Sequence, residues 1–132
     1  MNFAADLLCR KIIFAGSIYD QTELNSLRYF SSYYFHGHSS GGTNPSLLEA
    51  MACGCNIIAH DNAFNKYVLG SEADYFSKKE DIAMLLISPK ETTLLNERKE
   101  LNILKIKKEY NWEKVIDQYE TAMVNAVKSN KK

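Results

Sequence analysis

Short apolar stretches alternate with helical segments along most of the chain. Four apolar stretches have the length of buried strands: residues 11–15, 33–35, 56–59 and 73–76. The helical segments are expected to begin near Asp20, at Pro45 and after His60, and to include residues 79–87. Strands that alternate with helices form a parallel sheet with right-handed crossovers. The pattern therefore predicts an α/β fold with a doubly wound parallel sheet.

The apolar positions inside each predicted helix indicate which side faces the core. We expect buried faces made of Leu24, Leu27 and Tyr29 or Phe30; of Ile82, Leu85 and Leu86; and of Leu94, Leu95, Leu101 and Leu104 in a charged helix over 91–108. A last helix, capped by Asn111, should run from Trp112 to about Val127 and bury Val115, Ile116, Tyr119 and Met123. Residues 2–8 look like the end of a helix without a preceding strand, which favours an amino-terminal portion outside this chain.

The most informative segment is a polar, glycine-containing loop that leads directly into a short helix, in the sequence HGHSSGGTNPSLLEAMACG of residues 36–54. Asn44 is a favourable N-cap, and Pro45 suits the first helical position because its missing N–H costs nothing there. Gly54 should end the helix. The N–H groups of residues 41–43 and of the first helical turn are expected to face a ligand, and the helix dipole favours an anion such as phosphate.

A purely structural interpretation of this loop exists as well. Ser46 and Glu49 stand at the spacing of a capping box, and Asn-Pro is a common turn dipeptide. A helix start requires no ligand. However, the loop follows the predicted strand that ends at residue 35, and ligands of open parallel α/β sheets bind at the carboxyl ends of the strands.

Length and composition limit the possibilities further. The 132 residues suit one domain, residues 1–132, and 16 Lys and Arg balance 16 Asp and Glu, so no net field attracts nucleic acid. Three cysteines with a Cys-Gly-Cys pair indicate reduced thiols rather than a zinc site or disulfides. No leader peptide or membrane-spanning run is recognisable, which favours the cytoplasm, with weak membrane contact through the basic residues 128–132 as the less favoured alternative.

The run from Gly41 to Gly54 is similar to the signature of family 4 retaining glycosyltransferases, which have the GT-B architecture. The similarity extends through residues 14–20 and 59–65 and ends near Trp112 and Tyr119, so it covers about residues 11–119. The sequence pattern HGHSxGGTNP most resembles that of a bacterial subgroup often labelled rhamnosyltransferases. The resemblance implies a Rossmann-like, carboxyl-terminal, donor-binding lobe. The acceptor lobe, together with the family's Lys and Arg clamps, would precede it in the same polypeptide or lie on a partner chain.

In this family two glutamates eight positions apart contact the donor, a sugar nucleotide. The second corresponds to Glu49, which would bind the ribose hydroxyls through charge-assisted hydrogen bonds. The first corresponds to Gly41, which offers no carboxylate, so the sugar contact is not carried over. The donor-binding residues expected on this basis are His38, Gly41, Gly42, Thr43, Asn44 and Glu49.

The implied activity is transfer of a hexose, with retention, from a nucleotide diphosphate sugar to a glycan or lipid-linked acceptor in bacterial cell-surface polysaccharide synthesis. The chain alone is expected to bind donor weakly and to catalyse nothing. His36 and His38 alternate as on a strand and suggest a metal site, but a third ligand is not evident and the family binds its donor without metal or other cofactor. Two alternatives stay open. A dinucleotide-binding domain would need a glycine fingerprint that residues 16–19 do not supply, and an interaction module would use the loop only as a helix cap.

Overall fold

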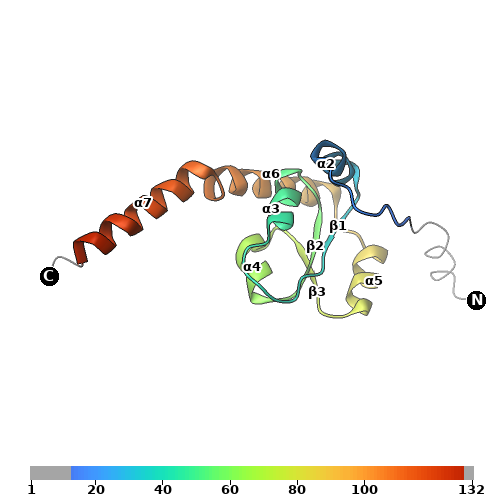
Figure 1. The fold of residues 1–132 in the computed structure, drawn as a ribbon. Coiled ribbons are helices and arrows are strands. Elements are labelled where there is room, and N and C mark those ends of the chain that lie inside the picture. The colour runs from blue at the N-terminus through green and yellow to red at the C-terminus, as the bar shows by residue number, and fades with distance from the viewer. Residues whose placement is uncertain (1–12, 130–132) are drawn as a thin grey trace, which may run out of the picture.

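The computed structural model describes residues 13–129, which form a three-stranded parallel sheet and six helices (Figure 1). The strands are β1 (Tyr34–His36), β2 (Ile57–His60) and β3 (Asp74–Phe76), in the order β1-β2-β3. The helices are α2 (Gln21–Phe30), α3 (Pro45–Ala52), α4 (Ala63–Leu69), α5 (Lys79–Ile87), α6 (Thr92–Glu109) and α7 (Trp112–Ser129). The predicted α/β class with a parallel sheet is confirmed. Strand order runs in one direction in the described part, so the doubly wound arrangement stays a prediction.

The sheet is centred on β2, whose first three residues are fully buried. Tyr34 of β1 lies opposite Ile57, and Ile58 lies opposite Asp74 of β3. A strand covered on both faces has no polar side to show, which explains the uninterrupted apolar sequence of β2. The main core lies on one face of this sheet and is built from Leu47, Ala50, Met51, Cys55, Ile57, Ala59, Val68, Leu69 and Ala73.

Local sequence signals place the helix ends correctly. The side chains of Asp20, Asn44, Asn62 and Asn111 each accept a hydrogen bond from a backbone N–H in the first turn of the helix that follows. Gly54 follows α3 with φ of +68°, and a Cβ at this position would lie 3.3 Å from Cδ1 of Ile103. The predicted boundaries hold because capping depends on neighbours within one turn.

The predicted strand at 11–15 does not form where it is described. Residues 13–15 have no strand pairing, and Ile13 and Phe14 are 85% and 93% exposed. Residues 11–12, Cys9 and the predicted helix end at 2–8 lie outside the described residues. A strand needs a neighbour to satisfy its backbone groups, and in the described part β1 pairs only with β2.

Several predicted inner faces are wrong. In α2 the buried residue is Arg28, whereas Leu27, Tyr29 and Phe30 are exposed and Leu24 is half-buried. In α5, Ile82 and Leu85 are half-buried but Leu86 is exposed.

In α6 the buried face is also not the predicted one. Leu94, Leu101 and Leu104 are exposed, and only Leu95 of the expected set is half-buried. The helix instead buries Asn102, whose Nδ2 donates to the carbonyl of Glu72 at 3.0 Å. Polar contacts thus set the rotation of α6, and an apolar periodicity does not record them.

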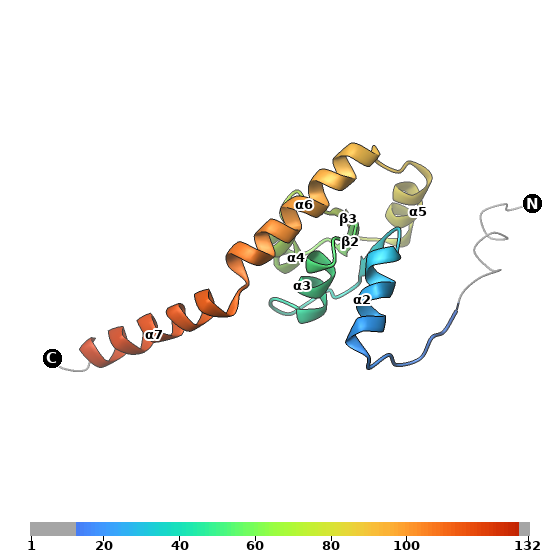
Figure 2. The same ribbon diagram turned by 90° about the horizontal axis from the view of Figure 1, so that it is seen from above.

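The last helix differs most from expectation. Ile116, Tyr119 and Met123 of α7 are 59–65% exposed, and Val115 is half-buried. Figures 1 and 2 show why: α7 continues beyond the end of α6 and projects away from the sheet, where no other described element covers it. The apolar residues of α7 have the spacing of an amphipathic helix, but the prediction that they pack in this core is wrong. Within residues 13–129, no helix is both long and apolar enough to cross a bilayer.

Candidate functional site

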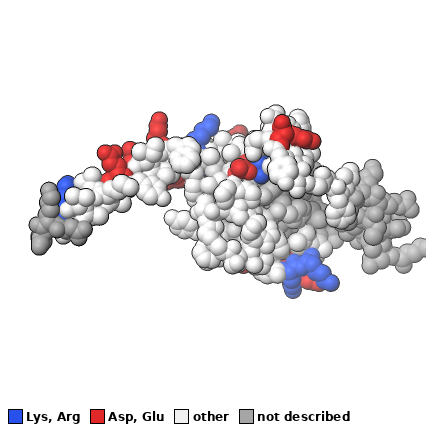
Figure 3. Space-filling model, viewed as in Figure 1, with Lys and Arg blue, Asp and Glu red and all other residues white. Residues whose placement is uncertain are grey.

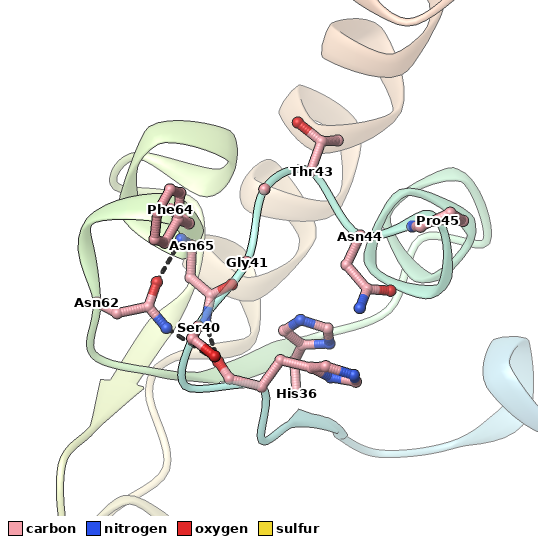
Figure 4. A pocket seen from close by; sticks show the side chains of 11 residues that line it. His36, Ser40, Gly41, Thr43, Asn44, Pro45, Asn62, Phe64 and Asn65 are labelled. Carbon is pink, nitrogen blue, oxygen red and sulfur yellow. Dashed lines mark hydrogen bonds between the residues drawn. The ribbon is translucent and has the colours of Figure 1, made fainter.

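A pocket lies at the carboxyl end of β1, where the glycine loop turns into α3 (Figure 4). We call it the loop pocket; its lining residues are His36, His38, Ser40, Gly41, Gly42, Thr43, Asn44, Pro45, Asn62, Phe64 and Asn65. Its volume is about 140 Å³. Because pockets for whole small-molecule ligands usually measure roughly 300–1,000 Å³, the loop pocket suits one group of a larger ligand.

The loop holds four backbone donors without a partner. The N–H groups of residues 41–44 have no acceptor in the described part of the chain. A glycine pair at this place leaves the backbone accessible, because neither residue carries a Cβ. The loop therefore offers a concentration of unpaired donors of the kind that binds anionic oxygen atoms.

The first turn of α3 contributes less than the sequence suggested. The N–H of Ser46 is bound by Oδ1 of Asn44 at 2.9 Å, and the N–H groups of Leu47 and Leu48 are bound by the Asn44 carbonyl at 3.0 and 3.2 Å. The expectation that the first-turn N–H groups are free is wrong, because Asn44 caps its own helix. What α3 still supplies is the positive end of its dipole.

Two asparagines hold the loop in place. Nδ2 of Asn62 and of Asn65 both donate to the carbonyl of His38, at 2.9 and 3.2 Å, and Asn65 also donates to the carbonyl of His60 at 2.9 Å. These bonds tie the loop after β1 to the end of β2 and the start of α4. Sequence reasoning missed both asparagines as site residues, although Asn62 at a strand end and helix start was a usable signal.

The two histidines of the loop lie face to face. The rings of His36 and His38 are stacked with their centroids 4.8 Å apart, and the ring of Tyr34 is nearly parallel to that of His36, with its centroid 6.3 Å away. His36 is only 2% exposed. Burial lowers the pKa of His36, and the nearby His38 lowers it further. His36 is therefore neutral at pH 7 in the unliganded protein.

Glu49 lies outside the loop pocket. Its carboxylate forms an ion pair with the guanidinium of Arg28 at 2.7 Å, and the Glu49 side chain is 42% exposed while that of Arg28 is only 7% exposed. The capping-box alternative for Ser46 and Glu49 is wrong, because Asn44 caps the helix. Glu49 lies five residues beyond Asn44, or about 7.5 Å along a helix axis.

The loop pocket carries no full charge from Lys, Arg, Asp or Glu (Figure 4). On the face shown in Figure 3, charged side chains gather along the helices and beside α5, while the middle of the domain is largely uncharged. Among residues 13–129, no group of three or more His, Cys, Asp or Glu is placed to hold a metal ion. The loop pocket therefore presents backbone amides, the positive end of the α3 dipole, neutral amide side chains and imidazole.

Comparison of the sequence with models of protein families and with curated proteins gives no match. Of the expected donor-binding residues, His38, Gly41, Gly42, Thr43 and Asn44 come together around the loop pocket, and Glu49 lies apart from them.

Proposed function

We propose that this domain is the donor-binding lobe of a retaining glycosyltransferase of the GT-B architecture. It would act in the cytoplasm and transfer a hexose from a nucleotide diphosphate sugar to a glycan or lipid-linked acceptor in bacterial cell-surface polysaccharide synthesis. The acceptor lobe would be supplied in cis or by a partner chain, and the complete sheet would be doubly wound. The motif over residues 41–54 supports this proposal together with the site described above.

One observation carries the proposal: four residues with unpaired N–H groups line one pocket between the carboxyl end of a parallel strand and a helix N-terminus. A diphosphate leaving group gains negative charge as the bond to the sugar breaks. Preorganised backbone donors and a helix dipole stabilise that charge without reorganisation, which is commonly the largest contribution of such sites. The loop pocket has room for the phosphate group next to the bond that breaks.

From the loop pocket, the rest of the sugar nucleotide could extend in two directions. Beside the loop pocket is a more open hollow, which we call the edge hollow, of about 440 Å³, lined by Tyr34, Phe35, His36, Gly37, His38, Ser39 and Ser40. On the other side, α3 leads to Glu49, whose half-exposed carboxylate is held by Arg28 and still has free acceptor capacity for a ribose diol. We assign the ribose to Glu49, because a carboxylate accepts both hydrogen bonds of a vicinal diol.

The test is an amide chemical-shift titration of the chain with UDP, GDP and dTDP and their hexose derivatives. We expect one base to shift the amides of residues 41–50. Gly42→Val is the diagnostic variant, because no protein atom lies within 4 Å of a Cβ added at Gly42, so the new side chain obstructs a ligand rather than the fold. Ala83→Val, on the exposed surface of α5, is the matched control and should bind as the unmodified chain does.

Glu49→Gln tests the ribose assignment. It keeps one acceptor for Arg28 and removes the charge, and it should weaken nucleotide binding roughly tenfold, as for one hydrogen bond to a charged group. Glu97→Gln makes the same change on an exposed part of α6 and should have no effect. If no nucleotide shifts residues 41–50, the alternative of a module without transferase activity is favoured instead.

A further inference from the structure

His36 is the last residue of β1, paired in register with Ala59 of β2. His36 is only 2% exposed, and its Nε2 atom has no hydrogen-bond partner in the described part of the chain. Buried polar atoms in native proteins nearly always have a partner, and one that lacks it costs free energy. The unpaired Nε2 therefore needs an explanation.

The position of the ring indicates what the missing partner is. His36 lines both the loop pocket and the edge hollow, and it lies next to the loop whose N–H groups are unpaired. Figure 4 shows it between Asn44 on the α3 side and Asn62 and Asn65 on the α4 side. The ring is stacked on that of His38, and the ring of Tyr34 lies nearly parallel to it, so its orientation is fixed without the use of Nε2.

We propose that His36 is an anion-binding residue whose imidazole donates a hydrogen bond to a phosphate oxygen seated between the loop amides and the N-terminus of α3. The identity of the ligand as the diphosphate of a sugar nucleotide rests on the proposed function; the phosphate chemistry does not. One phosphate group would then satisfy both the loop donors and the buried imidazole.

The charges around His36 favour this occupant. The α3 side of the pocket presents Asn44 and Pro45, and the α4 side presents Asn62, Phe64 and Asn65, none of them charged. His38 is the titratable group stacked on His36, and His60 is turned toward Asn62 and Phe76. The carboxylates of the flanking segments are paired elsewhere, Glu49 with Arg28 and Asp61 with Lys66. A bound phosphate would meet no competing negative charge.

A proton-linked affinity follows. Because burial and His38 lower the pKa of His36, the empty site holds a neutral ring. A bound dianion favours the imidazolium form, so binding raises the pKa of His36 and takes up a proton. Affinity should therefore rise as the pH falls from about 8 to about 6, across the range in which histidine titrates.

Sulfate is the first probe, because its charge does not change in this pH range, and inorganic pyrophosphate is the second. The chain is titrated with sulfate at constant ionic strength in chloride, while the histidine ring signals and the amides of residues 41–44 are followed by NMR. We expect sulfate to shift these amides, to bind more tightly at lower pH and to raise the pKa of His36.

Two variants separate the hydrogen bond from the proton. His36→Phe keeps a stacked ring without a donor and should bind sulfate roughly tenfold more weakly, as for one hydrogen bond to a charged group. His36→Gln keeps a donor near the same place but cannot be protonated, so it should bind with little pH dependence. Glu97→Gln changes an exposed residue of α6 that does not line the loop pocket and should behave as the unmodified chain does.

The outcomes distinguish this inference from the proposed function. Failure of sulfate and pyrophosphate to bind the unmodified chain, or unchanged affinity and pH dependence in His36→Phe, would overturn the role of His36. If a sugar nucleotide nevertheless shifts the amides of residues 41–50, the proposed function stands without a phosphate contact from His36. If sulfate binding depends on His36 but no sugar nucleotide binds, the anion site stands and the proposed function fails.

Discussion

Five polar or charged residues are buried in the described part of the chain: Arg28, His36, Asn65, Asp74 and Asn102. Four of them are held by side-chain partners or carbonyl groups; Asp74, for example, accepts from Lys90 at 2.5 Å and from Arg98 at 3.2 Å. The side chain of His36 has no partner among the described residues, whereas Arg28 and Asn102 leave only Nε and Oδ1 unpaired and are bound through their other polar atoms. A buried polar side chain without any partner is uncommon in proteins, and this one lines the loop pocket.

The stability of the chain should depend on pH through His36. Its pKa in the folded state is lowered, so between that value and the ordinary value of about 6.5 the unfolded chain binds more protons than the folded one. The stabilisation by a neutral His36 is thus fully present above about pH 6.5 and is lost as the pH falls through this range.

Urea unfolding in chloride buffers at about pH 7 and about pH 5.5, above and below the ordinary histidine pKa, measures this dependence. We expect the free energy of unfolding to be lower at the lower pH. The difference between the two pH values should be smaller in His36→Gln. The variant His60→Gln serves as the comparison. An unaltered slope in His36→Gln would show that His36 is not held neutral.

At the scale of elements, polar contacts decide how helices are rotated against the sheet. Both α2 and α6 have apolar residues at helical spacing, yet they bury Arg28 and Asn102 and expose several of those leucines. The contact between Asn102 and Glu72 joins residues 30 positions apart. Exposed leucines on the remaining surface are common in proteins and do not by themselves indicate a core face.

This difference can be measured on α6. Asn102→Ala removes a buried donor and leaves the Glu72 carbonyl without its partner, so it should lower the free energy of unfolding by about 1–3 kcal/mol. Leu104→Ala, which the apolar pattern marks as a core change, should cost less than about 0.5 kcal/mol because Leu104 is exposed. Chemical denaturation of both variants tests the rotation of α6, and a larger loss in Leu104→Ala would contradict it.

At the scale of the whole molecule, the chain consists of a small packed domain and a projecting helix. The core is concentrated where α3 and α4 cover one face of the sheet, and α3 also contacts α6. By contrast, α7 has no buried residue (Figure 2). The loop pocket lies on the packed part, so the site is held by the domain that carries the core.

Two matched truncations test this division. Leu69→Ala removes a fully buried side chain and should destabilise the chain by about 2–5 kcal/mol. Ile116→Ala removes an exposed side chain from α7 and should change the free energy of unfolding by less than about 0.5 kcal/mol. A comparable loss in both variants, measured by urea unfolding, would show that α7 packs against the domain after all.

The sequence by itself determined the α/β class, three of the strands, most helix boundaries and the loop that forms the pocket. These features depend on interactions within a few residues, such as the Asn44 cap, the Pro45 start and the turn at Gly54. For the same reason most of the expected site residues were found, since they lie together in one loop.

Only the tertiary structure decided which helix faces are buried, which loop amides are unpaired and where Glu49 and His36 lie. Each of these depends on residues far apart in the chain, such as Arg28 against Glu49 or Asn65 against His38, 27 positions away. Hydrophobic periodicity describes one element at a time and gives no information about its partner. Residues 13–15, the described part of the predicted strand at 11–15, form no strand for this reason, because a strand forms only where another strand satisfies its backbone groups.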